Sequence, residues 1–197
     1  MLLMIATLRP APAHAQTNAD STYIRRECRL ASRIIATGHP APHERWAEGF
    51  ITNCGREGGA AIAAGMRALR TETDIAALSR QTIHAHILRD SSVFAVAMEI
   101  AADRGASIPA RVFAFRSLLF LLKPDRQVSY RDLTGGFDEI GAPRATCAVG
   151  SYIADQLQLE GAPLPADYAS RIHALGRRIF DDHTEPTDVR TAAGCVP

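Results

Sequence analysis

Helices recur along the first 124 residues of this chain with a period of about 34 residues. The recurring unit is a helix, a short break and a second helix, and it occupies residues 21–54, 55–90 and 91–124. One helical hairpin cannot bury its apolar face, whereas a stack of hairpins buries a continuous core. The sequence therefore predicts an all-α fold, a short stack of antiparallel helical hairpins, with residues 125–197 as a C-terminal helical cap.

The third unit shows this pattern most clearly. Ser91 or Ser92 is expected to cap its first helix, and Gly105 is expected to end that helix. The second helix begins near Ile108, ends before Pro124 and is apolar on nearly every side. A helix that is apolar all round is buried all round, so this one should lie at the centre of the domain.

A shift of about 34 residues brings apolar positions of the second unit onto apolar positions of the third. The pairs are Ile62 with Val96, Met66 with Ile100, Leu78 with Val112, and Ile87 with Leu121. Segment 108–119, IPARVFAFRSLL, resembles the second helix of a HEAT repeat. Residues 21–124 are thus similar to HEAT-like proteins of the α-α superhelix class. The resemblance implies a protein-binding surface on the concave face of the stack.

The other helices are predicted from apolar spacing and from the residues that break helices. They are 21–36, 43–53, 145–159 and 165–182, with a tail over 184–197. Trp46 and Phe50 are one turn apart, so their rings should share a helix face. Thr71 or Thr73 is the expected cap of the helix that carries Ile75.

The N-terminus predicts export. Residues 1–8 are apolar, and Ala13-His14-Ala15 before Gln16 is typical of a signal-peptide cleavage site. The apolar run is short and no positive charge precedes it, which a start codon assigned too far downstream would explain. The expected product is a single periplasmic or secreted domain, 16–197, and the alternative is an exposed leader over 1–15. No later segment reaches the roughly 18 uninterrupted apolar residues of a membrane span.

Four cysteines remain after the expected cleavage: Cys28, Cys54, Cys147 and Cys195. An even count in an exported chain favours disulfides, and four cysteines allow three connectivities. The repeat arrangement favours Cys28–Cys54, because these residues lie on the two arms of the first hairpin. Cys147–Cys195 then follows and would hold the C-terminal tail. A zinc site is the rival interpretation, but the sequence has no CxxC spacing.

The charged residues exclude some partners. The formal net charge is +1, so no overall attraction to nucleic acid or anionic lipid is expected. Lys123 is the single lysine among 22 basic residues, and the others are arginines. Guanidinium groups bind carboxylates and phosphates well. A GC-rich genome would produce the same bias, and the 21 acidic residues are interspersed with the arginines.

Several histidine and acidic residues raise the question of a metal site. His84 and His86 are two positions apart, so on a helix they point about 200° from each other. His43-Glu44 begins an HExxH pattern, which fails because Ala47 holds the position of the second histidine. Carboxylates and an imidazole also gather at Asp181-Asp182-His183 and Glu185, which could hold Ca²⁺ or form a solvated helix end.

These patterns favour a non-enzymatic scaffold that binds an unknown protein partner and needs no cofactor. The candidate partner surface comes from the second helices of the units: Arg45, Glu48, Arg80, His84 and Arg111. The alternative is a small-ligand or metal-dependent enzyme, with a site lined by His39, His43, Asp181, Asp182 and His183. A purely structural role is the third possibility. No nucleophile elbow, P-loop or dinucleotide-binding glycine pattern occurs in the sequence.

Overall fold

The computed structural model describes residues 13–88, 90–122 and 162–196, and every regular element in these ranges is a helix. The α-helices are α1 (Ala13–Ile35), α2 (Trp46–Phe50), α3 (Gly55–Ala68), α4 (Ile75–Leu88), α5 (Ser91–Ala102), α6 (Ile108–Leu122), α8 (Tyr168–Asp181) and α9 (Thr187–Gly194). Two 3₁₀ turns, η1 (Pro42–Glu44) and η2 (Ile51–Cys54), flank α2. The predicted all-α class is confirmed.

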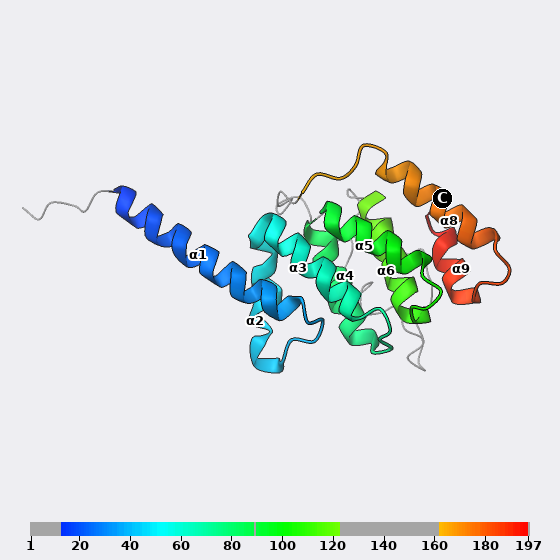
Figure 1. The fold of residues 1–197 in the computed structure, drawn as a ribbon, viewed down its shortest axis with the longest axis horizontal. Coiled ribbons are helices and arrows are strands. Elements are labelled where there is room, and N and C mark those ends of the chain that lie inside the picture. The colour runs from blue at the N-terminus through cyan, green and yellow to red at the C-terminus, as the bar shows by residue number, and fades with distance from the viewer. Residues whose placement is uncertain (1–12, 89, 123–161, 197) are drawn as a thin grey trace, which may run out of the picture.

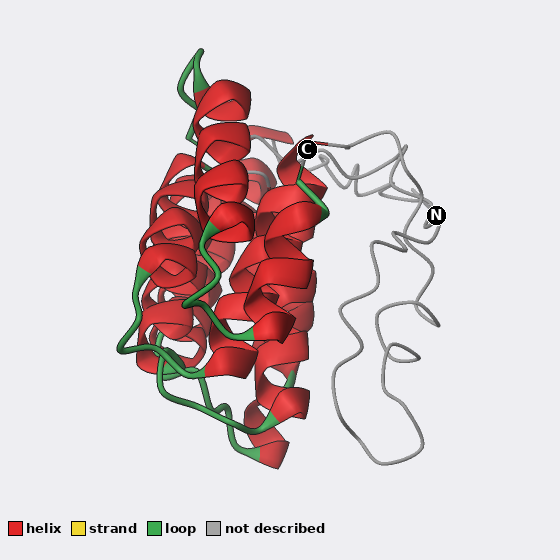
Figure 2. Ribbon diagram, turned by 90° about the vertical axis from the view of Figure 1, so that its right-hand side faces the viewer, coloured by secondary structure: helices red, strands yellow, loops and turns green. Residues whose placement is uncertain are grey.

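The helices form two layers. In the first layer α1 packs on α3, α3 on α5, and α5 on α8. In the second layer η2 packs on α4, α4 on α6, and α6 on α9. Consecutive helices also pack across the layers, so the chain advances as hairpins from α1 at one end to α8 and α9 at the other (Figure 1). In Figure 2 the helices lie side by side, with loops at the ends of the bundle. The predicted helical stack is confirmed.

Helix α6 lies at the centre of the stack, as its composition predicts. It contacts α4, α5 and α9, and nearly all of its side chains between Ala110 and Leu121 are buried. Each large apolar side chain buried in this way contributes about 1.5–3 kcal/mol to folding. The helix therefore joins both layers and three hairpins in one core.

Aspartates cap two of the helices, and the predicted serine and threonine caps are wrong. Asp90 precedes α5, and its Oδ1 accepts a hydrogen bond of 2.7 Å from the backbone N–H of Ser92. Asp74 precedes α4 and accepts a bond of 2.8 Å from the N–H of Ala76. Helix α5 already includes Ser91 and Ser92, and α4 begins two residues after Thr73, so none of the expected residues is in the cap position. Aspartate caps a helix as well as serine does.

Two predicted segments differ from the structure. The predicted continuous helix over 43–53 is wrong, because the chain forms the short elements η1, α2 and η2 there. Gly55 then starts α3 with a φ of +53°, a value that favours glycine. The tail over 184–197 is also wrong, because α9 lies within it and buries Val189 against α8 and α6. The predicted helix over 145–159 lies outside the described residues.

The first helix differs from the others in its length. It begins at Ala13, three residues before the expected mature N-terminus at Gln16, and its N-terminal half extends beyond the body of the stack (Figure 1). None of the helices in the described ranges has both the length and the apolar character that crossing a membrane requires.

Candidate functional site

A surface groove of about 660 Å³ lies between α1 and α3. Helix α1 contributes Arg26, Arg29, Ser32 and Arg33, Ala36 follows the end of α1, and α3 contributes Glu57, Ala60, Ala61 and Ala64. The three arginines are spaced by three and four residues, so they lie on one face of α1. The groove therefore has a basic wall on α1 and a floor of small side chains on α3.

The sequence of each helix explains the shape of this groove. One face of α1 is buried against the core and carries Cys28, Ala31 and Ile35. The groove arginines lie on the opposite face of the helix and are therefore exposed. On α3 the alanines fill little of the space in front of the helix. Larger side chains at these positions would occupy the groove, so its volume follows directly from the alanine-rich composition of α3.

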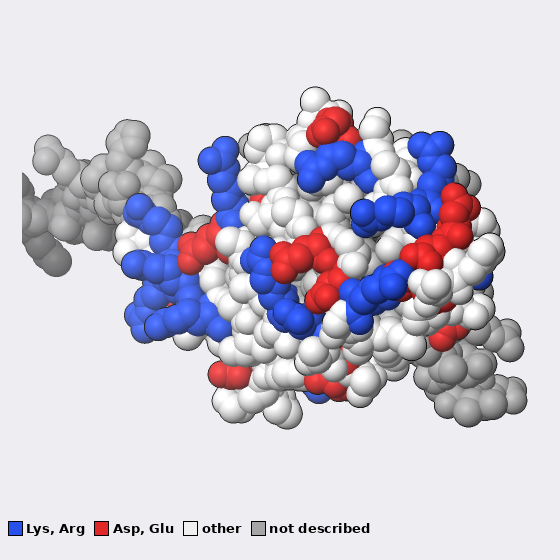
Figure 3. Space-filling model, turned by 45° about the vertical axis from the view of Figure 1, so that its right-hand side comes forward, with Lys and Arg blue, Asp and Glu red and all other residues white. Residues whose placement is uncertain are grey.

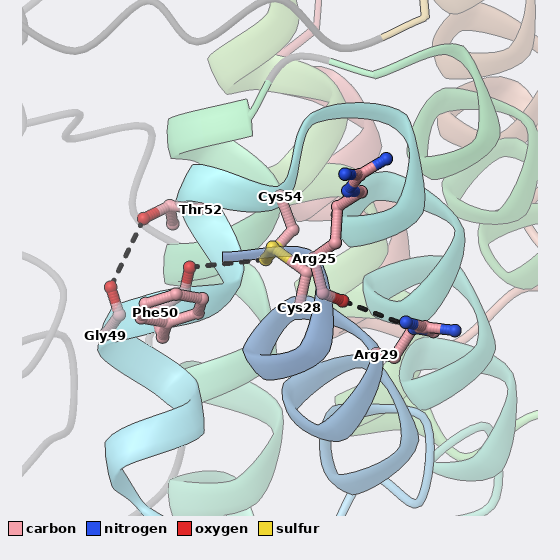
Figure 4. Close-up of a disulfide and its surroundings, with 7 residues drawn as sticks. All are labelled: Arg25, Cys28, Arg29, Gly49, Phe50, Thr52 and Cys54. Atoms are coloured by element: carbon pink, nitrogen blue, oxygen red, sulfur yellow. Dashed lines mark hydrogen bonds between the residues drawn. A yellow bond between two sulfur atoms is a disulfide. The ribbon is translucent and has the colours of Figure 1, made fainter. Parts of the chain in front are cut away.

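A disulfide holds the two walls together. Cys28 lies in the arginine-rich part of α1 and is bonded to Cys54, the residue directly before α3, with a Cα–Cα distance of 5.4 Å. Figure 4 shows Arg25 and Arg29 beside this bond, with the Arg29 Nε donating to the Arg25 carbonyl over 3.4 Å. The predicted Cys28–Cys54 pair is confirmed. Cys195 is also disulfide-bonded, and its predicted partner Cys147 lies outside the described residues.

The groove arginines are exposed to solvent. Within the described part of the chain, Arg26, Arg29 and Arg33 form no ion pair. Glu57 is the acidic residue in the lining, so the groove has an excess of positive charge. Figure 3 shows blue side chains gathered over the α1 end of the molecule. In the wall, the Ser32 hydroxyl oxygen is buried and makes no hydrogen bond to described residues.

The predicted partner surface is only partly assembled. Arg45 is exposed just before α2, and Glu48 on α2 forms an ion pair of 3.4 Å with Arg80 on α4. These three residues therefore lie on the second layer. The side chain of His84 lies outside the described residues. The prediction for Arg111 as an exposed residue is wrong, because its side chain is 2% exposed and lies in the core.

Arg111 instead joins an ion-pair network between two hairpins. Its Nη1 lies 2.5 Å from Oε2 of Glu185, and its Nε donates to the Ala101 carbonyl over 3.1 Å. Arg104 binds the same loop from outside, with Nε 3.0 Å from Oε1 of Glu185 and Nη2 2.6 Å from Oδ2 of Asp182. The α5–α6 hairpin thus holds the loop between α8 and α9.

The arginines and Thr184 lower the pKa values of the carboxyl groups in this network. Hydrogen bonding to Arg111 lowers the pKa of Glu185 against the opposing effect of burial, and Arg104 lowers it further. The side-chain and backbone hydrogen bonds from Thr184 lower the pKa of Asp182, with a smaller contribution from Arg104. Two of the carboxylates considered for Ca²⁺, Asp182 and Glu185, therefore bind arginines instead. Among the described residues no group of three or more His, Cys, Asp or Glu side chains could hold a metal ion.

The residues considered for an enzyme site are not brought together. His39 follows α1, and its Nε2 lies 3.1 Å from Oε2 of Glu72 in the loop before α4. Asp182 binds Arg104 at the α8–α9 end of the stack, which Figure 1 shows opposite the α1–α2 end. His39 and His43 therefore lie apart from Asp181, Asp182 and His183, which are consecutive residues at the α8–α9 end.

Sequence reasoning missed the α1–α3 groove. Its signal is present in the chain as arginines at positions i, i+3 and i+7 of the first helix, with alanines on the facing helix. Neither pattern marks a site alone, because arginines are common on solvated faces and alanines in helix contacts. Only the packing of α1 on α3 brings them together.

The chain matches no protein-family model, no curated protein and no solved structure. Its fold and its groove define a class of protein: an all-α stack of helical hairpins with a basic surface groove near one end.

Proposed function

We propose that this chain is an exported, non-enzymatic protein of the HEAT-like repeat class that binds a partner protein as a scaffold in the bacterial envelope. The α1–α3 groove is its docking surface. The observation that carries the proposal is the set of three exposed arginines above a floor of alanines, and these arginines form no ion pair within the part of the chain that the structure describes. Guanidinium groups in this arrangement are available to carboxylates of another chain.

The form of the groove supports a polypeptide as the ligand. Pockets for small molecules are concave, mostly apolar and bury most of the ligand surface. The α1–α3 groove is instead open to solvent, with exposed arginines along one wall and alanines on its floor, so it would leave much of a small ligand uncovered. A segment of another protein can contact such a floor while its charged side chains bind the wall.

The stiffness of the stack and its disulfides support the same proposal. A docking surface that is already ordered loses little conformational entropy when a partner binds. Cys28–Cys54 fixes α1 beside the start of α3, and disulfides persist in oxidising compartments such as the periplasm. The signal-like residues 1–15 and the HEAT-like resemblance of residues 21–124 agree with export and with protein binding.

The test is capture of a partner in the native envelope by chemical cross-linking, with matched variants as baits. Arg26→Ala with Arg33→Ala removes two groove charges, and Arg177→Ala with Arg178→Ala removes two exposed charges from α8. We expect a partner bound by the wild type and by the α8 variant and lost by the groove variant. Equal capture by all three chains would place the docking surface elsewhere, and capture by none would contradict the scaffold function.

A further inference from the structure

We infer that the α1–α3 groove takes an acidic helical segment of its partner, one that presents three carboxylates along a single face. This inference rests on the proposed protein-binding function. It names the chemistry of the bound segment, which the fold alone leaves open. Spacing, charge and floor shape each restrict that chemistry.

The spacing of the arginines matches the spacing of side chains on a second helix. Arg26, Arg29 and Arg33 are separated along α1 by about 4.5 Å and about 6 Å, given a rise of about 1.5 Å per residue. Carboxylates at positions i, i+3 and i+7 of a helix lying alongside have the same separations. Each guanidinium can then bind one carboxylate through two parallel hydrogen bonds.

The floor of the groove admits a helix at close range. Ala60, Ala61 and Ala64 present only methyl groups from α3. Packed helices approach to about 8–10 Å between axes, and the shorter distances need small side chains at the contact. A bound helix can therefore rest on α3 while its acidic face contacts α1.

The two sides of the groove differ in charge, because Glu57 is acidic and the residues opposite it on α1 are basic. Glu57 lies on the α3 side, opposite the arginines of α1. A segment that is acidic all round would place a carboxylate near Glu57, and like charges repel. The preferred ligand carries its carboxylates on the α1 side only, with neutral or basic residues facing α3.

The same features disfavour a nucleic acid. Nucleic acids bind along extended basic tracks that neutralise many phosphates. The groove offers three arginines along about 10 Å of helix from Arg26 to Arg33, beside a glutamate and a methyl-lined floor. The net charge of the whole chain is only +1.

The test uses a defined probe and fluorescence anisotropy with the oxidised full chain. The probe is a labelled, alanine-based helical peptide of about 15 residues with glutamates at i, i+3 and i+7. One control peptide carries glutamines at these positions, and another has three glutamates spread around the helix. We expect the probe to bind and neither control peptide to bind. Raised salt should weaken the binding of the probe, because the charges are exposed.

The protein variants locate the binding. We expect Arg26→Ala with Arg33→Ala to raise the dissociation constant of the probe about tenfold. Arg177→Ala with Arg178→Ala should change binding by no more than about twofold. The acidic-helix inference would be overturned if the peptide with glutamates spread around the helix bound as well as the probe. It would also be overturned if both protein variants lost probe affinity equally. Tighter binding of a single-stranded oligonucleotide with the same arginine dependence would overturn it in favour of a nucleic acid.

The two proposals can fail separately. If cross-linking finds a partner that the groove variant loses, and the acidic probe does not bind, the groove is a docking surface with another ligand chemistry. In that case the inference is wrong and the proposed function stands. Failure of both the probe and the capture would contradict both.

Discussion

The two ends of the stack use arginine in opposite ways. At the α1 end, Arg26, Arg29 and Arg33 are exposed around a groove and form no ion pair with described residues. At the α8–α9 end, Arg111 is buried against Glu185, and Arg104 adds ion pairs to the same loop. The first set leaves positive charge available to a partner, whereas the second set joins one hairpin to the next.

The comparison shows that burial, and not residue type or net charge, separates structural arginines from candidate binding arginines. A buried arginine needs an internal counter-ion, since an unpaired buried charge is strongly unfavourable. Arg111 has one in Glu185. An exposed arginine has no such need, and its charge can serve association instead. Each prediction below challenges one side of this difference, beginning with the largest effect.

Removing the buried counter-ion should have the largest effect on stability. Glu185→Ala leaves Arg111 buried without an ion-pair partner, and we expect a loss of about 3–5 kcal/mol in the free energy of unfolding. The measurement is urea unfolding. The matched control is Glu99→Ala, which breaks the half-exposed ion pair with Arg67 and should lose less than about 1 kcal/mol. Similar small losses in both variants would contradict a structural role for Arg111.

Removing the covalent link at the other end should have the next largest effect. Cys28→Ser with Cys54→Ser frees α1 from the start of α3, and we expect a loss of about 2–4 kcal/mol in urea unfolding. The bond at Cys195 stays in place, so the change is confined to the α1 end. The acidic probe should bind this variant more weakly, because the groove walls are no longer held together. Unchanged stability and unchanged probe binding would show that packing alone fixes the groove.

A pair of glycines should show how tightly each end is packed. A Cβ at Gly176 of α8 would overlap Cγ2 of Val196 and lie 2.7 Å from its carbonyl oxygen, so Gly176→Ala should lose about 1–3 kcal/mol in the free energy of unfolding. A Cβ at Gly49 of α2 has nothing within 4 Å, so Gly49→Ala should gain about 0.5–1 kcal/mol from helix propensity. Thermal unfolding measures both. A loss at Gly49 as large as that at Gly176 would contradict the difference in packing.

Acid should weaken the buried ion pair. The pKa of Glu185 is lower in the folded chain than its ordinary value, chiefly through its hydrogen bond to Arg111. The stabilisation is therefore present above about pH 4.3 and is lost as the pH falls through the folded pKa. Between neutral pH and about pH 3, the wild type should lose more stability than Glu185→Gln does. Parallel pH profiles of the two proteins would contradict the assignment.

Removing the groove charges should have the smallest effect on stability. Arg26→Ala with Arg33→Ala should change the free energy of unfolding by no more than about 0.5 kcal/mol, because both side chains are exposed and neither forms an ion pair with a described residue. The α8 pair Arg177→Ala with Arg178→Ala serves as the matched control in the same urea titration. A loss in the groove variant of the size expected for Glu185→Ala would make these arginines structural.

Much of the fold could be predicted from the sequence. Apolar spacing and helix-breaking residues predicted an all-α stack of helical hairpins, and the apolar composition of α6 indicated its central position. The position of Cys28 and Cys54 on two arms of one hairpin indicated their disulfide. These features depend on local periodicity, or on contacts between neighbours in the chain.

Features that depend on distant contacts could not be predicted. Arg111 has the spacing of a surface residue, and only Glu185, 74 positions later, explains its burial. Helix α9 is short and polar in composition, and its packing on α8 and α6 accounts for its formation. The groove needs α1 and α3 side by side, so neither helix reveals it alone.

The most direct test of the difference between the two ends is an NMR titration of the ¹⁵N-labelled protein with the acidic helical peptide. The arginine Nε–Hε resonances report on each guanidinium group separately. We predict that the resonances of Arg26, Arg29 and Arg33 shift on binding, while those of Arg104 and Arg111 stay in place. Shifts at Arg104 and Arg111, or no shift at the groove arginines when the peptide is bound, would contradict the division between a binding end and a structural end.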